Sequence, residues 1–287
     1  MGLFVPYWGI YLKSLSFNAL QIGALLSLFQ ISRIFAPNIL GWVADRSGEY
    51  IKWIKISSFF GFIVFMGIFW SNTFINIFIV MMAMSIFTSS TLPLAESLTL
   101  AHLKANKADS KYSHIRLWGS IGFIVAALLL GVMIDSYGER SLIYALLTTQ
   151  LVIFFLAFIL PEKKINFTKG NKRSIWPILK QREVIVLLLS CALMVSSHGL
   201  LYNFYSIFLE EQGYSGAIIG VLWSVGVVFE ILIFLLMPKI LSKFTLKAVL
   251  LISLGFAVIR FFLIGAYVDS IIILVVAQIM HAATFGS

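Results

Sequence analysis

The sequence predicts an all-α membrane protein that crosses the bilayer about ten times. It is 60% hydrophobic and 11% charged, and its mean hydropathy is +0.99. A soluble globular domain carries about 25% charged residues, so this chain is too apolar to be one. Apolar runs of roughly 20 residues recur along the whole length, and each is long enough to cross a hydrocarbon core as a helix. The alternating strands of about ten residues that build a transmembrane β-barrel do not occur.

We place the membrane spans on the apolar runs, in chain order. They are Met1–Leu12, Leu20–Val43, Trp53–Trp70, Phe74–Leu100, His114–Asp135, Leu142–Leu160, Val184–Leu209, Ile218–Met237, Leu246–Tyr267 and Ser270 onward. The longest polar segment, 161–183, separates six spans from the rest and is read as a cytoplasmic linker. The predicted domains are therefore an N-terminal bundle over 1–160 and the first helices of a C-terminal bundle over 184–287.

The ends of the sequence predict a fragment. A helix over Met1–Leu12 rises only about 18 Å at about 1.5 Å per residue, against a hydrocarbon core of about 30 Å. The last span stops at Ser287 with no flanking charge. We expect part of the first helix, and whatever follows the tenth, to be missing.

The basic residues gather on one side of the membrane. That side holds Arg46, Lys52, Lys55, Lys104, Lys107, Lys111, Arg116, Lys163 to Arg182, Lys239, Lys243 and Lys247, whereas the other holds Lys13 and Arg140 beside Glu210 and Glu211. By the positive-inside rule the basic side is cytoplasmic. The net charge of +9 is thus a topology signal, and no basic, aromatic-rich soluble domain is present to bind nucleic acid.

Several classes of chemistry find no support in the sequence. No glycine-rich phosphate loop, metal-ligand spacing or nucleophile motif occurs, and the four histidines are scattered over different spans. Cys191 is the only cysteine and lies in an apolar span. We expect no cofactor, no metal and no catalytic site. A membrane enzyme stays open as an alternative from another class, as does a scaffolding membrane protein.

Charged residues inside the spans point to a transport pathway. Arg33 and Glu230 each lie near the middle of an apolar run, where a charge usually faces a protein interior or a water-filled pathway. The number of residues between Arg33 and Glu230 also separates Gly23 from Gly220 and Ser27 from Ser224, so the sequence contains an internal repeat. Because a shift of six helices preserves orientation, this repeat fits two parallel halves.

The loop after the second span resembles a known signature. It reads Gly41-Trp42-Val43-Ala44-Asp45-Arg46-Ser47-Gly48, and it is similar to the major facilitator motif of glycine, three residues, then Asp-Arg-x-Gly. Glycine at 41 would allow close helix approach, and Gly48 would permit a tight turn. Asp45 would meet the positive N-terminus of a neighbouring helix and act as a charge lock on the cytoplasmic side. Glu49-Tyr50 departs from the basic residues usual in the family.

A closer resemblance runs almost end to end. It is carried by Pro93-Leu94-Ala95-Glu96, Arg116-Leu117-Trp118-Gly119-Ser120, Gly213-Tyr214-Ser215, the stretch from Trp223 to Glu230, Val258-Ile259-Arg260 and Gln278-Ile279-Met280-His281. These segments resemble the phenylpropionate permease family and, more distantly, lactose permease and the oligosaccharide:proton symporters. The resemblance implies a major facilitator fold of two six-helix bundles.

The resemblance also implies site residues. Glu96 and Arg116 would hold the solute, Glu230 would touch both solute and coupling network, and Arg260 and His281 would belong to the proton-coupling cluster. Three departures from the lactose permease pattern matter. The coupling glutamate expected three residues after His281 is Thr284, the lysine expected three residues before it is Gln278, and the tryptophan that stacks on the sugar is Phe123. They argue against a sugar as the solute, and proton coupling cannot use that glutamate.

We therefore expect a secondary active transporter, a proton symporter for a small organic solute working by alternating access. An aromatic carboxylate such as phenylpropionate is the leading solute, held by Arg116 or Arg33 as a bidentate ion pair. A nucleoside or a sugar is the alternative. Protons and the lipid bilayer are the other expected partners of a monomer in a bacterial inner membrane.

Overall fold

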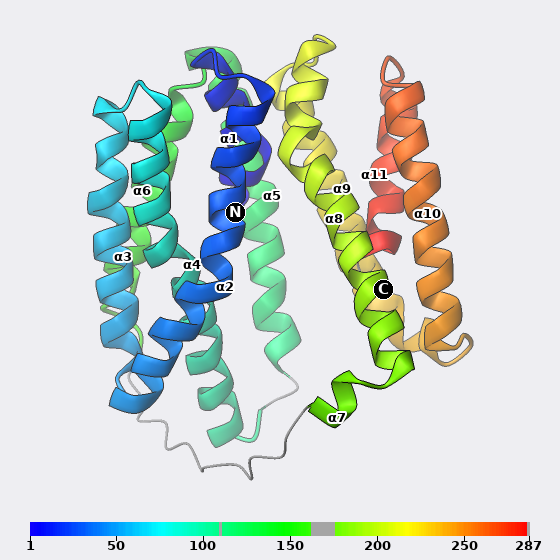
Figure 1. Cartoon of the computed structure of the whole chain (residues 1–287), viewed down its shortest axis with the longest axis horizontal. Coiled ribbons are helices and arrows are strands. Elements are labelled where there is room, and N and C mark those ends of the chain that lie inside the picture. The colour runs from blue at the N-terminus through cyan, green and yellow to red at the C-terminus, as the bar shows by residue number, and fades with distance from the viewer. Residues whose placement is uncertain (109–110, 162–175, 286–287) are drawn as a thin grey trace. The chain divides into compact units, whose positions relative to one another are not determined.

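The computed structural model describes residues 1–108, 111–161 and 176–285, and the elements in these ranges are helices (Figure 1). In chain order they are α1 (Phe4–Ser14), α2 (Ala19–Ser47), α3 (Tyr50–Met66), η1 (Gly67–Trp70), α4 (Phe74–Ala105), α5 (Tyr112–Tyr137), α6 (Ser141–Leu156), α7 (Trp176–Leu179), α8 (Arg182–Glu211), α9 (Gly216–Leu241), α10 (Leu246–Ala266) and α11 (Ile271–Phe285). Each predicted span has its helix, and the all-α membrane fold is confirmed. Most of the predicted linker, residues 162–175, lies outside the described ranges.

The helices have the length and composition of membrane spans. Among the described residues, seven helical segments are long and apolar enough to cross a bilayer, with α3 and η1 counted as one. The apolar helices α6 and α11 are shorter. The protein is a multi-pass integral membrane protein.

Side-chain caps explain where several helices begin. Asn18 accepts a hydrogen bond from the Gln21 N–H and forms a capping box with it, while Thr73, Ser215 and Thr245 each accept from the backbone three residues later. Such caps satisfy N–H groups that have no partner inside the helix. Polar residues just before the apolar runs therefore set the starts of α2, α4, α9 and α10.

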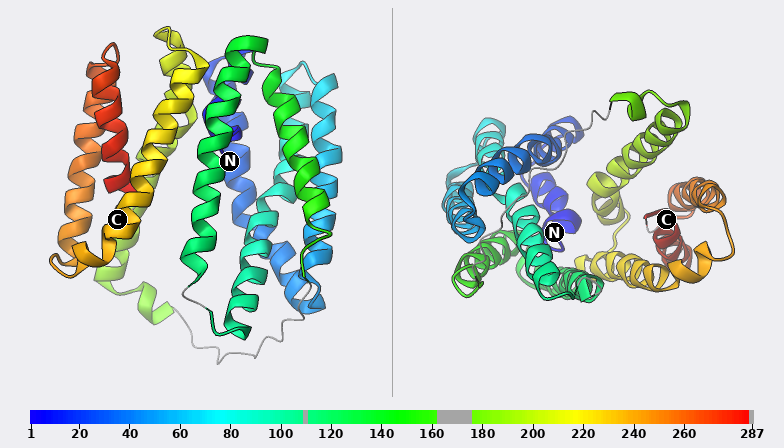
Figure 2. Two further views of the ribbon diagram at one scale, coloured as in Figure 1. Left: turned by 180° about the vertical axis from the view of Figure 1, so that it is seen from behind. Right: turned by 90° about the horizontal axis from the view of Figure 1, so that it is seen from below.

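The chain divides into two compact units. The first unit contains Met1–Ile10, Arg116–Leu142 and the described residues from 176 onward; the second contains Tyr11–Ile115 and the described residues from Ile143 to 161. In the first unit, α11 packs against both α9 and α10 (Figure 2).

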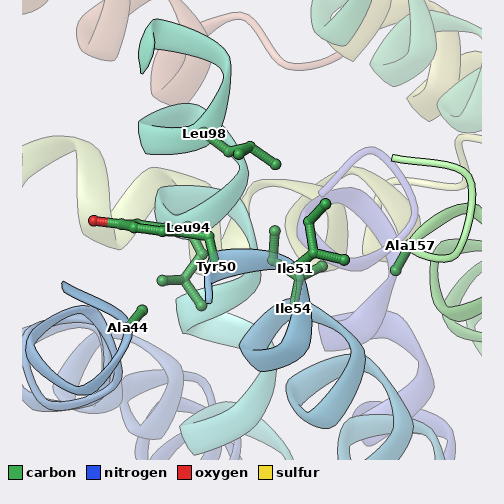
Figure 3. Packing of buried hydrophobic residues seen from close by; sticks show 7 residues of the cluster. All are labelled: Ala44, Tyr50, Ile51, Ile54, Leu94, Leu98 and Ala157. Carbon is green, nitrogen blue, oxygen red and sulfur yellow. The ribbon is translucent and has the colours of Figure 1, made fainter. Parts of the chain in front are cut away.

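The second unit is built around α4, which packs against α2 and α3. At one end its core is a cluster of buried apolar side chains from α2, α3, α4 and the residue that follows α6 (Figure 3): Ala44, Tyr50, Ile51, Ile54, Leu94, Leu98 and Ala157. Deeper in the unit, the hydroxyl oxygens of Ser32 and Ser85 lie 2.5 Å apart and join α2 to α4. Aromatic contacts such as Phe59 on Phe154, with ring centroids 5.5 Å apart, fasten α6 to α3.

Candidate functional site

The first unit gathers ionisable and aromatic side chains from five helices, α5, α8, α9, α10 and α11. His198 of α8 is buried; its Nδ1 lies 2.9 Å from the Met194 carbonyl oxygen and its Nε2 lies 3.1 Å from the Thr284 hydroxyl of α11. The ring of His281, one helical turn before Thr284, lies 6.2 Å from the His198 ring. Three polar residues that the sequence spreads over α8 and α11 thus form one buried group.

The direction of the hydrogen bonds in this group depends on whether His198 is neutral or doubly protonated. The Thr284 hydroxyl also lies 2.8 Å from the His281 carbonyl oxygen, and a hydroxyl has a single proton to donate. A neutral His198 donates from Nδ1 to Met194 and accepts at Nε2 from Thr284. A doubly protonated His198 donates from both nitrogens, and the Thr284 hydroxyl then donates to the His281 carbonyl. The same atoms therefore accommodate both protonation states.

Arg260 of α10 is a buried charge of the same unit. It is only 1% exposed, and among the described residues its Nε and Nη1 atoms have no hydrogen-bond partner. Its charge acts on Tyr202 and Tyr205 of α8 and on the two histidines. A buried guanidinium is strongly destabilising unless an anion or hydrogen-bond acceptors compensate for lost water. This position therefore favours an anionic partner.

Three aromatic side chains lie side by side in this unit, those of Phe123, Tyr202 and Trp223, and are called the aromatic wall below. The Trp223 indole N–H of α9 donates to the Ser206 hydroxyl at 2.9 Å, which fixes the ring. The rings of Tyr202 and Phe123 lie 5.7 Å and 6.4 Å from it. Phe123 stands where the resemblance would put a sugar-stacking tryptophan, and Trp223 adds a larger ring next to it.

Glu230 of α9 is half-buried, and the charge of Arg116 at the start of α5 acts on it. Tyr202 lies within electrostatic range of both Glu230 and Arg260. The structure thus brings Glu230 together with Arg116, and Arg260 together with His281, and Tyr202 connects the two pairs.

The predicted charges of the second unit lie on α2 and α4. Arg33 is exposed on α2, and Glu96 is half-buried on α4, one turn after Pro93. Glu96 and Arg116 belong to different units, and their pairing remains a prediction.

The signature loop has the tight turn that its sequence predicts. Gly48 ends α2 in the left-handed conformation with φ +70°, and its N–H donates to the Ala44 carbonyl. Asp45 is exposed and accepts a hydrogen bond from the Tyr50 hydroxyl at the start of α3. Arg46 lies over the Trp42 ring, with Cζ 5.4 Å from its centroid. Among the described residues a Cβ on Gly41 would meet no atom within 4 Å, and the close helix approach expected of this glycine stays a prediction.

The sequence is similar to a known family of proteins over its whole length. The model described as the MFS_1 like family matches residues 1–287, the whole sequence. The chain belongs to the MFS_1-like family of major facilitator transporters. It is 28% identical over 290 residues to the Escherichia coli (strain K12) protein named "Probable 3-phenylpropionic acid transporter", covering 99% of this chain and 75% of that one. It is also 25% identical to the nucleoside permease NupG of Escherichia coli (strain K12), over 97% of this chain and 73% of the relative.

A solved structure supports the major facilitator fold. The crystal structure of a mutant of the nucleoside transporter NupG superposes with a TM-score of 0.88 at 21% sequence identity, and the match covers 99% of this chain and 76% of that chain. The MFS_1-like protein is accordingly a membrane transporter of the bacterial inner membrane, and its relatives are transporters and permeases, not enzymes.

Sequence reasoning identified Glu230, Arg260 and His281, but it missed the roles of Trp223 and Ser206 in positioning the aromatic wall. Their hydrogen bond joins α8 to α9 across 17 residues, and neither residue carries a local signal of that contact. His198 was visible as a polar residue in an apolar run, but the sequence did not indicate Thr284 as its partner.

Proposed function

We propose that the protein is a proton-coupled symporter that carries a small aromatic carboxylate by alternating access, as a monomer. The observation that carries the proposal is the grouping of Phe123, Tyr202 and Trp223 beside two basic groups, Arg116 and Arg260, in one unit of the fold. Rings of this kind stack on an aromatic solute, and a guanidinium binds a carboxylate through paired charge-assisted hydrogen bonds. The relative named for 3-phenylpropionic acid has a solute with both features.

We assign Glu96, Arg116, Phe123 and Glu230 to the solute, with Arg33 as a further charge of the cavity. Glu230, Arg260 and His281 serve proton coupling. A carboxyl group withdrawn from water favours its neutral form, and a nearby cation favours the ionised form. Glu230 therefore gains or loses a proton as the distance to Arg116 and Arg260 changes. His198 and Thr284 support coupling, because their hydrogen bonds accommodate one proton more or less.

The transport cycle uses the two predicted bundles. Residues 1–160 and 184–287, joined by the linker 161–183, would rock around a site near the bilayer midplane, as in other transporters with repeated halves. Asp45, Arg46, Gly41 and Gly48 would belong to the closure on the cytoplasmic side.

Uptake into proteoliposomes tests this function. The full-length protein should accumulate radiolabelled 3-phenylpropionate when an acid-outside pH gradient is imposed. Protein-free liposomes measure the diffusion of the neutral acid, and a protonophore should remove the protein-dependent part. Gradient-independent uptake that stops at equal concentrations would contradict proton coupling.

A nucleoside is the second candidate solute, because the sequence is also 25% identical to the nucleoside permease NupG over 97% of this chain. The same vesicles should therefore be tested with labelled uridine. Saturable uptake of uridine that 3-phenylpropionate does not inhibit would replace the carboxylate with a nucleoside.

A further inference from the structure

The end of α5 is bonded to the beginning of α9. Asp135, in the last turns of α5, accepts hydrogen bonds from the backbone N–H groups of Gly216 at 2.6 Å and Ala217 at 2.8 Å. The Ser215 hydroxyl accepts from the next N–H, that of Ile218, at 3.3 Å. The first N–H groups of a helix have no partner within it, and a negative charge there is favoured by the helix dipole. The carboxylate of one helix thus caps another.

The two helices are also in backbone contact next to this cap. A Cβ on Gly220 would lie 2.6 Å from the Ala127 carbonyl oxygen, and a Cβ on Gly131 would overlap the Gly216 carbonyl oxygen. The Tyr7 hydroxyl oxygen of α1 lies 2.7 Å from the Ala127 carbonyl oxygen and 3.1 Å from the Gly216 carbonyl oxygen. Three helices therefore meet here, and the Tyr7 hydroxyl is bonded to the backbone of both α5 and α9.

The membrane topology predicts the side of the bilayer on which this contact lies. The helix α5 begins beside the basic loop around Lys111 and ends at Tyr137, two residues after Asp135, so the positive-inside orientation puts Asp135 on the extracytoplasmic side. Asp135 itself is exposed, whereas Gly216 and Gly220 are buried. Water thus reaches the carboxylate but not the helix face below it.

We propose that Asp135 is the latch of the extracytoplasmic gate: its carboxylate, bound to the N-terminus of α9, holds α5 on α9 and closes the pathway to the outside. The inference rests on the proposed alternating access, because Asp135 and Gly216 belong to different predicted bundles. Opening to the outside separates the two glycine-lined faces and exchanges these hydrogen bonds for water. Hydrogen bonds to a charged group are stronger than those between neutral groups. Loss of the carboxylate should therefore raise the ratio of outward-open to outward-closed protein roughly tenfold.

Thiol labelling tests the latch without measuring transport. In a Cys191→Ser background, which removes the only native cysteine, Ser224→Cys places a reporter one turn beyond Gly220 at a buried position. A membrane-impermeant thiol reagent is added from the extracytoplasmic side. Asp135→Asn should raise the labelling rate roughly tenfold, Asp135→Ala more, and Asp135→Glu less than either.

The matched control is Asp269→Asn. Asp269 is an exposed aspartate in the turn between α10 and α11, on the same side of the membrane. Removing its charge should leave the labelling rate unchanged. Labelling of the Asp135 variants within twofold of this control would overturn the latch.

A crosslink separates the latch from the transport cycle. In the same background, Asp135→Cys with Ala217→Cys is joined by a short bis-methanethiosulfonate, which forms a disulfide with each thiol as methanesulfinate leaves, and a reductant cleaves the link. Uptake of labelled 3-phenylpropionate should stop and should return after cleavage. If the crosslink stops uptake but the labelling rates do not change, the latch is wrong and alternating access stands. Transport by the crosslinked protein would overturn both.

Discussion

Replacing Gly220 with alanine tests the packing of α9 on α5. The new Cβ would lie 2.5 Å from the Tyr7 hydroxyl oxygen and 2.6 Å from the Ala127 carbonyl oxygen, distances that real Cβ atoms do not adopt. Because one of these atoms belongs to the backbone of a packed helix, α9 must move away. Overpacking of this kind destabilises by about 1–3 kcal/mol.

A matched control removes the effect of helix propensity. Where nothing obstructs the new Cβ, glycine to alanine inside a helix stabilises by about 1 kcal/mol through helix propensity. Gly122 lies inside α5, and a Cβ there would meet nothing within 4 Å. Gly122→Ala should therefore stabilise the protein, and the difference between the two variants isolates the overpacking term of about 1–3 kcal/mol.

Thermal unfolding in detergent measures that difference. Each kcal/mol shifts Tm by about 2–4 °C in domains of about 150–250 residues, so Gly220→Ala should unfold several degrees below Gly122→Ala at the same scan rate. Adding Tyr7→Phe should recover only part of the loss, since the Ala127 oxygen remains. Equal Tm values for the two alanine variants would refute the close approach of α5 and α9.

Two further predictions concern the second unit. Asp45→Asn replaces the carboxylate that accepts a hydrogen bond from the Tyr50 hydroxyl at the signature loop, and it should slow uptake. Membrane insertion, measured by surface labelling, should not change. Wild-type uptake by this variant would mean that the loop is only a marker of topology. Ser85→Ala leaves the buried Ser32 hydroxyl without its partner across the helices and should destabilise by about 1 kcal/mol or more in thermal unfolding. The double variant with Ser32→Ala should lose less than the sum of the two single variants, and strict additivity would contradict their coupling.

The helices could be predicted from the sequence because the cause of each lies in a local run of residues. A bilayer demands about 20 apolar residues for each span, and polar residues such as Asn18, Thr73 and Ser215 stand where the caps begin. The turn at Gly48 was predictable for the same reason, since its left-handed conformation favours glycine. The close approach assigned to Gly41 stays a prediction, because it depends on a neighbouring helix, which the loop sequence does not encode.

The candidate site was predictable only in part. Glu230, Arg260 and His281 stand out because a charged or polar side chain is rare in an apolar run. Their grouping was not predictable: the structure puts Glu230 near Arg116 and Arg260 near the two histidines. Asp135 appeared in the sequence merely as the end of a span, because its partner Gly216 lies 81 residues further along the chain.

Proton movement during transport tests the proposed coupling most directly. When 3-phenylpropionate is added to proteoliposomes in weakly buffered medium, the external pH should rise faster than with protein-free vesicles, because each carboxylate enters with a proton. Glu230→Gln cannot release a proton, so it should show no pH change beyond the protein-free control and no uphill accumulation, while exchange of labelled for unlabelled solute continues. Wild-type proton movement and gradient-driven accumulation by the Glu230→Gln protein would contradict the account.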